Sequence, residues 1–291
     1  MSEAIAITQV KVFDGKGLTE ERTVVIDKGV ISDATTAERT VDGQHGTLLP
    51  GFIDSHVHLM NVAALEQGTQ WGCTTMLDMG SQSMALTNSL RHRTGLADIR
   101  GAGNVASAPG GFQTTRMGFP ASSAVTGPTD AGRFVAERVA DGADYIKVIV
   151  EDPRIMGSAA LDVATIAAIV EAAHQAGLKA IAHVTTLAAL TNAADAGVDI
   201  LTHVPIDADV DEKLAVAIAK RGIVSVPTLT MMRGTASVAA HLPTHAGSRV
   251  DYAHARSTVT AFHRASVTIL AGTDAHQAPA TPANTVPTPF L

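Results

Sequence analysis

Two histidines, His56 and His58, stand one residue apart directly after an apolar run and a Pro-Gly pair. On a β-strand, side chains two residues apart project from the same face, so His-Val-His at a strand end directs both imidazoles toward one point. Two converging imidazoles are typical of a metal site. A single His-x-His pair is common by chance, however, so the metal interpretation needs further polar residues beside it.

Four further polar residues stand at the ends of apolar, strand-like runs. They are Lys147 in YIKVIV, His183 in KAIAH, His203 in ILTH and Asp274 after VTILAG. The carboxyl ends of parallel strands meet at one edge of a barrel, so all six side chains can meet at one mouth. Alone, each has an ordinary interpretation: a solvent-reaching lysine, buried structural histidines and a turn-capping aspartate. Their joint placement favours a functional site.

Apolar runs alternate with amphipathic segments along most of the chain. Eight runs predict strands, at residues 48–54, 74–79, about 100–106, 145–150, 179–183, 200–203, 223–228 and 267–272. Helical spacing of apolar residues predicts helices at 131–140, 162–176, 187–196, 209–220 and 246–264. A strand and a helix repeated in this way predict an α/β fold, specifically a (β/α)8 TIM barrel.

The two ends of the chain depart from the barrel pattern. Residues 4–13 and 23–31 flank a turn and predict a small β hairpin, an incomplete β-sandwich within residues 1–47. The barrel is expected over residues 48–276. Residues 277–291 are rich in proline, which excludes a regular helix, so the last barrel helix is expected to be missing and replaced by an extended tail.

Composition limits the classes of function. The chain has 291 residues, a formal net charge of -7 and no run of Lys or Arg, so neither nucleic acid nor an anionic membrane is an expected partner. One cysteine allows no intrachain disulfide and no thiolate metal cluster. The N-terminus lacks a basic region followed by an apolar core. We therefore expect a cytoplasmic protein that acts on a small-molecule substrate.

The segments GFIDSHVH, YIKVIV, AIAHV, ILTHV and LAGTDAH, in this order, resemble the amidohydrolase superfamily. The resemblance runs from about residue 4 to about residue 286 and is to the imidazolonepropionase-like and prolidase-like branch, in which a lysine bridges two metals. It implies that His56, His58 and Asp274 bind the more buried metal and that His183 and His203 bind the second. It also implies that CO2 carboxylates Lys147, which then bridges both ions.

This resemblance implies a metallopeptidase-like hydrolase with two divalent metal ions, most simply Zn2+, with Mn2+, Co2+ or Fe2+ as alternatives. A metal-bridging hydroxide would attack an amide C–N bond in dipeptides or N-acyl amino acids, with Asp274 as general acid/base. The same nucleophile also suits an ester, lactone or phosphotriester. The alternative from another class is a catalytically silent, truncated protein of the same fold.

Substrate residues are expected in the loops at 108–120 and 227–234. Arg116 or Arg233 could pair with a substrate carboxylate, and Phe112 and Met231 could line an apolar pocket. Solvated arginines and core packing are the ordinary alternatives. Members of the superfamily continue well beyond the strand-eight aspartate, whereas this chain stops soon after it. We therefore expect a partner subunit to cover the exposed surface, which predicts a homo-oligomer.

Overall fold

The computed structural model describes residues 3–153, 158–239 and 250–276. The chain divides into two compact units, residues 1–52 and residues 53–291. The expected proline-rich tail at 277–291, with the missing last helix, lies outside the described residues, as do the first four residues of the helix expected at 246–264.

The N-terminal unit is a mixed five-stranded sheet, which contains the expected antiparallel pair and further strands beside it. Strand β1 (Ile5–Val12) pairs antiparallel with β2 (Arg22–Asp27) and parallel with β4 (Arg39–Asp42) and β5 (Thr47–Leu48); β3 (Val30–Ser32) flanks β2. The sequence pattern missed β4 because all four of its residues are exposed and two are charged.

The expected strand at 48–54 is divided between the two units. Strand β5 ends at Leu48 in the N-terminal sheet, and β6 (Phe52–His58) begins after Pro50-Gly51. Proline has no N–H group to continue a ladder, which explains the break. Strand β6 therefore contains both His56 and His58 rather than ending before them.

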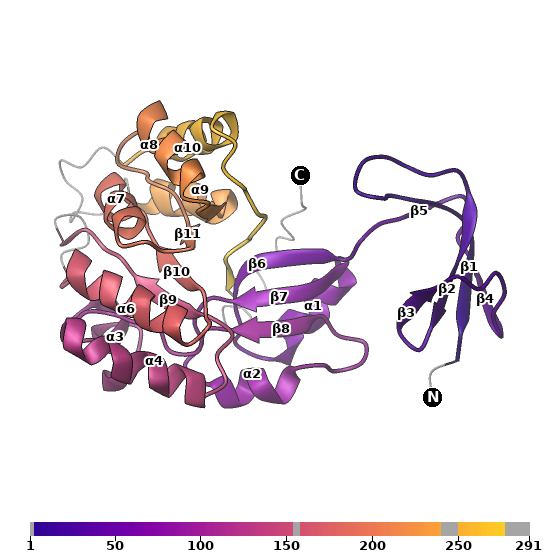
Figure 1. Cartoon of the computed structure of the whole chain (residues 1–291), viewed down its shortest axis with the longest axis horizontal. Coiled ribbons are helices and arrows are strands. Elements are labelled where there is room, and N and C mark those ends of the chain that lie inside the picture. Colours follow the sequence, from indigo (N-terminus) through magenta and orange to yellow (C-terminus); the bar gives the residue numbers. More distant parts are fainter. Residues whose placement is uncertain (1–2, 154–157, 240–249, 277–291) are drawn as a thin grey trace. The chain divides into compact units, whose positions relative to one another are not determined.

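The larger unit contains two four-stranded sheets (Figure 1). One has the order β13-β6-β7-β8, with β7 at Cys73–Asp78, β8 at Asp98–Gly101 and β13 at Ala275–His276. The other has the order β12-β11-β10-β9, with β9 at Ile146–Ile149, β10 at Ala180–His183, β11 at Ile200–Thr202 and β12 at Val224–Val226. The pairings among β9 to β12 are all parallel.

Backbone hydrogen bonds join the two sheets on both sides. Ala106, beyond the end of β8, pairs with Val148 of β9. On the other side, Thr268 and Leu270 bond to the backbone of Ser225 in β12. The residues that follow bond to β6: the N–H of Ser55 donates to the carbonyl of Ala271, and the N–H of Asp274 donates to the carbonyl of His56. The segment expected as strand eight is therefore not a regular strand, because it bonds first to one neighbour and then to the other.

Helices follow the strands as expected along most of the unit. They are α1 (Val62–Gln70), α2 (Met84–Leu90), α3 (Phe112–Thr115), α4 (Ala131–Ala140), α6 (Val163–Gln175), α7 (Leu187–Asp195), α8 (Glu212–Lys220), α9 (Leu229–Ala239) and α10 (Tyr252–Arg264). The side chains of Asp162, Thr186 and Asp211 each accept a hydrogen bond from the backbone three residues on, which fixes where α6, α7 and α8 begin.

Two segments expected as loops contain helices. Most of 227–234 lies in α9, and 108–120 contains α3. Figure 1 shows α4, α6 and α7 along the outside of β9 and β10, where Ile166, Ile169 and Val170 of α6 belong to the main core. None of the described helices has the length and apolar character needed to cross a membrane.

Candidate metal centre

The alternation of side chains along the strands separates the core from the site. In β9, Ile146 and Val148 belong to the core shared with the helices, so Lys147 between them faces the opposite side. In β6, Val57 belongs to the core shared with α1, and His56 and His58 face away from it. In these two strands, the named apolar side chains face the helices and the named polar ones face the opposite side.

Three buried residues form the centre of the site: His56, His203 and Asp274. One donor atom from each lies within 4.8 Å of the others. The imidazole Nε2 of His56 is 3.4 Å from Oδ1 of Asp274, and Nδ1 of His203 is 3.8 Å from its Oδ2. Neither ring nitrogen of His56 makes a hydrogen bond within the described residues, which is the state of an imidazole free to bind a cation.

The other three expected ligands adjoin this centre. Nε2 of His58 is 3.2 Å from Oδ1 of Asp274, and the rings of His183 and His203 are 4.5 Å apart. Lys147 is only 2% exposed, and its ammonium donates a hydrogen bond to the hydroxyl of Thr202. All six residues expected from the sequence therefore lie in one cluster, and their role as metal ligands stays a prediction.

A second layer of polar groups orients the ligands. Nδ1 of His58 contacts the carbonyl of Gly80 at 3.1 Å, and Nδ1 of His203 contacts the hydroxyl of Thr228 at 2.7 Å. Asp54 accepts hydrogen bonds from the backbone N–H groups of His56 and Thr273 and from the hydroxyl of Thr273. Asp54 thus ties β6 to the segment that carries Asp274. Second-layer contacts of this kind fix ligand orientation in metal sites.

Three non-glycine residues at the site have left-handed backbone conformations. The φ angles are 66° at His203, 44° at Thr228 and 56° at Asp274. Such conformations are uncommon for non-glycine residues and most costly for β-branched ones such as threonine, and they concentrate at functional sites. Here they turn the chain at the ends of β11 and β12 and before β13.

Burial sets the electrostatics of the cluster. It lowers the pKa of Lys147 to about 7, against the charge of Asp274, which acts to raise it. Burial, together with the charge on Lys147, lowers the pKa of His183 to about 3. The pKa values of His56 and His203 are also lowered well below the usual value, with burial as the main cause. The imidazoles are therefore neutral near pH 7, which is the form that binds metal.

Sequence reasoning missed several residues of the site. Glu151 lies two residues beyond the end of β9, is 6% exposed and has Oε1 at 3.7 Å from Nε2 of His183. Burial raises the pKa of Glu151 to about 7, opposed by a hydrogen bond from the side chain of Gln113. The signal that could have found Glu151 is its position just beyond a fully buried strand. No such signal marked Thr228 or Gln113.

The four residues expected to bind substrate lie in or beside α3 and α9. Arg116 and Arg233 are exposed, Phe112 is 38% exposed, and Met231 is half-buried, where its sulfur accepts a hydrogen bond from Thr235. Their role in substrate binding stays a prediction.

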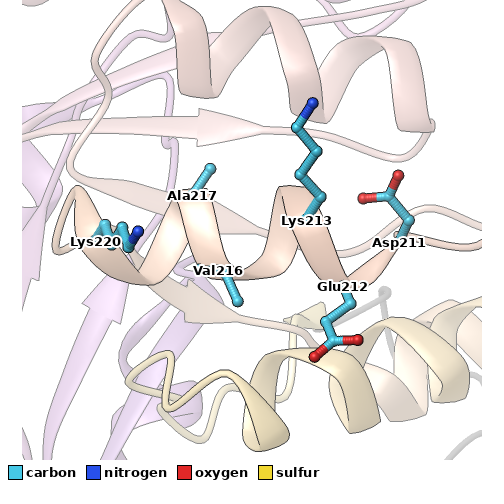
Figure 2. A pocket seen from close by; sticks show the side chains of 6 residues that line it. All are labelled: Asp211, Glu212, Lys213, Val216, Ala217 and Lys220. Carbon is cyan, nitrogen blue, oxygen red and sulfur yellow. The ribbon is translucent and has the colours of Figure 1, made fainter.

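A shallow hollow of about 630 Å3 lies elsewhere, along α8 (Figure 2). It is lined by Asp211, Glu212, Lys213, Val216, Ala217 and Lys220. Figure 2 shows that Glu212 and Lys213 point to opposite sides of the helix, so their polar groups do not converge. None of the six clustered residues lines this hollow, and we interpret it as an irregularity of the helix surface.

The model of the amidohydrolase family matches residues 47–287. This chain belongs to the amidohydrolase family. Together with the buried His56, His203 and Asp274 cluster, this makes it an amidohydrolase-family hydrolase with a candidate metal site.

Relatives and solved structures also match most of this chain. An uncharacterized protein of Mycobacterium tuberculosis strain H37Rv is 28% identical over 285 residues, covering 90% of this chain and 73% of that protein. An Xaa-Pro dipeptidase with bound methionine in its active site is 23% identical, with a TM-score of 0.74, and the match covers 94% of this chain and 79% of the dipeptidase. A prolidase complexed with N-methylphosphonate-L-proline is 24% identical, with a TM-score of 0.72 and coverage of 93% and 78%. The larger unit therefore shares the fold of amidohydrolase proteins.

Proposed function

We propose that this protein is a binuclear metal-dependent hydrolase with a TIM-barrel core that cleaves an amide C–N bond in dipeptides or N-acyl amino acids. The observation that carries the proposal is Lys147, a lysine that is 2% exposed and faces inward beside a cluster of four histidines. An ammonium at this position would repel cations. With its pKa near 7, Lys147 carries a large fraction of free amine at neutral pH, which is the form that CO2 carboxylates.

The residues present fit two divalent cations. His56, His58 and Asp274 would hold one, and His183 and His203 the other, with carboxylated Lys147 as an anionic ligand to both. Imidazole and carboxylate donors suit Zn2+ best, with Mn2+, Co2+ or Fe2+ as alternatives. Neither nitrogen of buried His56 has a hydrogen bond among the described residues, which supports this assignment, because burying an imidazole without hydrogen bonds is costly unless a cation binds it.

Two bound cations would supply an acidified water near neutral pH and polarise the carbonyl group of the substrate. Asp274 would hold the proton released from that water on its carboxylate and deliver it to the leaving nitrogen. Its backbone N–H bonds to the carbonyl of His56, and its carboxylate lies within 4 Å of three imidazoles, so its position is closely fixed. His58 and His183 are the more accessible ligands and would face the substrate.

The test is a hydrolysis screen of protein depleted of metal with a chelator and then reconstituted with Zn2+ and bicarbonate. We expect turnover of Xaa-Pro and other dipeptides or of N-acyl amino acids, only after reconstitution. His203→Asn should abolish it, whereas His263→Asn, a matched change of an exposed histidine on α10, should not. Turnover of esters or lactones alone, or turnover that survives the chelator, would contradict the proposal.

A further inference from the structure

Glu151 is a buried carboxylate that the proposed chemistry does not use. It stands two residues beyond the end of β9, with only 6% of its surface exposed. The side chain of Gln113, itself buried and bonded to Ser107, donates a hydrogen bond to it. Its other carboxylate oxygen, Oε2, has no hydrogen-bond partner among the described residues. An ionisable group buried with an unpaired oxygen is costly, so it is rarely kept for packing alone.

Within residues 3–153, 158–239 and 250–276, no ion pair with lysine or arginine balances the charge of Glu151. The basic group recorded within 4 Å of it in the described part of the chain is His183, at 3.7 Å. A histidine that binds metal is neutral and brings no positive charge. Glu151 also lies outside the group of three residues whose donor atoms are within 4.8 Å of one another, which are His56, His203 and Asp274. It therefore lies beside the metal cluster without joining its buried centre.

Accessibility indicates the side from which a substrate arrives. The side chains of His56, His203 and Asp274 are at most 5% exposed, whereas those of His58 and His183 are each 22% exposed. A substrate carbonyl therefore reaches the cluster past the two accessible histidines, and Glu151 flanks one of them. In an amino acid the α-nitrogen lies only about 2.5 Å from the carbonyl carbon, from standard bond lengths and angles. An α-ammonium group beside the reacting carbonyl is thus close enough to reach Glu151.

We propose that Glu151 binds the free α-ammonium group of the substrate, so that the protein selects dipeptides over N-acyl amino acids. This inference rests on the proposed amide hydrolysis and narrows its substrate class. An ammonium would pair with the unpaired oxygen and neutralise the carboxylate. A substrate without that group leaves Glu151 buried and unpaired, and sites with an unpaired polar group discriminate strongly against such analogues.

The test compares substrates that differ only in this ammonium: Ala-Pro and Ala-Phe against N-propionyl-proline and N-propionyl-phenylalanine. With the metal-loaded protein, kcat/KM should be about 100-fold higher for the dipeptide of each pair. Glu151→Gln should remove most of this preference, chiefly through a higher KM for the dipeptides, and should change the propionyl substrates by less than about threefold. Glu66→Gln, on the exposed face of α1, is the matched control and should keep the preference.

Metal content is measured on every variant. Loss of metal in Glu151→Gln would overturn the inference, because Glu151 would then be a ligand. Equal cleavage of both members of each pair by the unaltered protein would overturn the inference alone and leave the proposed function standing. Cleavage of neither member by metal-loaded protein would overturn the proposed function and the inference with it.

Discussion

The two ends of the strands in the larger unit are built differently. At the N-terminal ends, carboxylates are fully paired. Asp199, before β11, accepts hydrogen bonds from Lys179 at 2.7 Å and from His174 and the backbone of Ala180 at 2.8 Å. Asp144, before β9, accepts one from the backbone of Gly101 at 2.7 Å and pairs with Arg91 through two nitrogens. These contacts tie strands and helices together.

At the C-terminal ends, two buried side chains have polar atoms without a hydrogen bond among the described residues. His56 has two nitrogens without hydrogen bonds in the described structure, and Glu151 has one such oxygen. Three residues at this end also have left-handed backbone conformations. From this difference we infer that the N-terminal ends stabilise the fold. The C-terminal ends hold buried polar groups at a cost in stability, as is typical of a site that binds a ligand. This division is general in barrel enzymes.

The largest effect is expected from Lys147→Ala. The variant would lack the proposed bridging ligand, so the second metal should be lost and hydrolysis should fall to background. A short carboxylate such as propionate, added to the medium, should restore part of the activity. The control is Lys213→Ala on the exposed face of α8, which should keep both metals. Full activity in Lys147→Ala would defeat the bridge assignment.

Asp274→Asn should lower kcat by roughly 10²- to 10⁴-fold, because an amide cannot accept and deliver the proton. The substitution preserves shape, so at least one metal per chain should remain, as elemental analysis would show. Asp195→Asn at the exposed end of α7 serves as the comparison. An unchanged rate would remove the proton-transfer role.

Gly272→Ala tests how closely the segment before Asp274 packs against β6. An added Cβ would lie 2.5 Å from Cγ1 of Val226 and 2.9 Å from Cβ of His56, so the backbone or one of these two side chains must shift. We expect destabilisation of about 1–3 kcal/mol, measured by urea unfolding, together with weaker metal binding. Gly132→Ala in α4, where the added group meets nothing within 4 Å, should instead be neutral or stabilising. Equal midpoints for the two variants would contradict the packing argument.

The smallest effect is expected at the opposite strand end, from Asp199→Asn. Burial alone would raise the pKa of Asp199, but hydrogen bonds from Lys179, Ala180 and His174 outweigh it and lower the pKa below 3.8. A carboxylate whose pKa is lowered by folding stabilises the protein above pH 3.8, and this contribution is lost as the pH falls below that value.

The variant should therefore unfold about 1–2 kcal/mol more easily at pH 7, and this difference from the unaltered protein should shrink below pH 4. Metal content and kcat/KM should not change. A loss of activity without a loss of stability would contradict the division between the two strand ends.

The sequence predicted that the six polar residues lie together, because the carboxyl ends of parallel strands meet at one edge of the fold. The helix expected at 131–140 has the observed bounds of α4, since its apolar spacing and flanking turn are both clear. The number of metals and the carboxylation of Lys147 stay predictions.

Other features depend on contacts that no local pattern encodes. The segment expected as strand eight bonds first to β12 and then to β6. These bonds depend on where the two sheets meet and not on the local sequence. Helix α9 begins inside the segment 227–234, which was expected as a loop because it follows the seventh predicted strand. We assign Glu151 to the proposed site from its contacts with Gln113 and His183, which lie in distant parts of the chain.

The most direct test of the central claim is the metal content of the protein, measured by elemental analysis after reconstitution with Zn2+ and bicarbonate and removal of free metal. The account predicts two metal ions per chain, falling to one or none in Lys147→Ala. A chain that binds no metal, or that keeps two ions in Lys147→Ala, would contradict it.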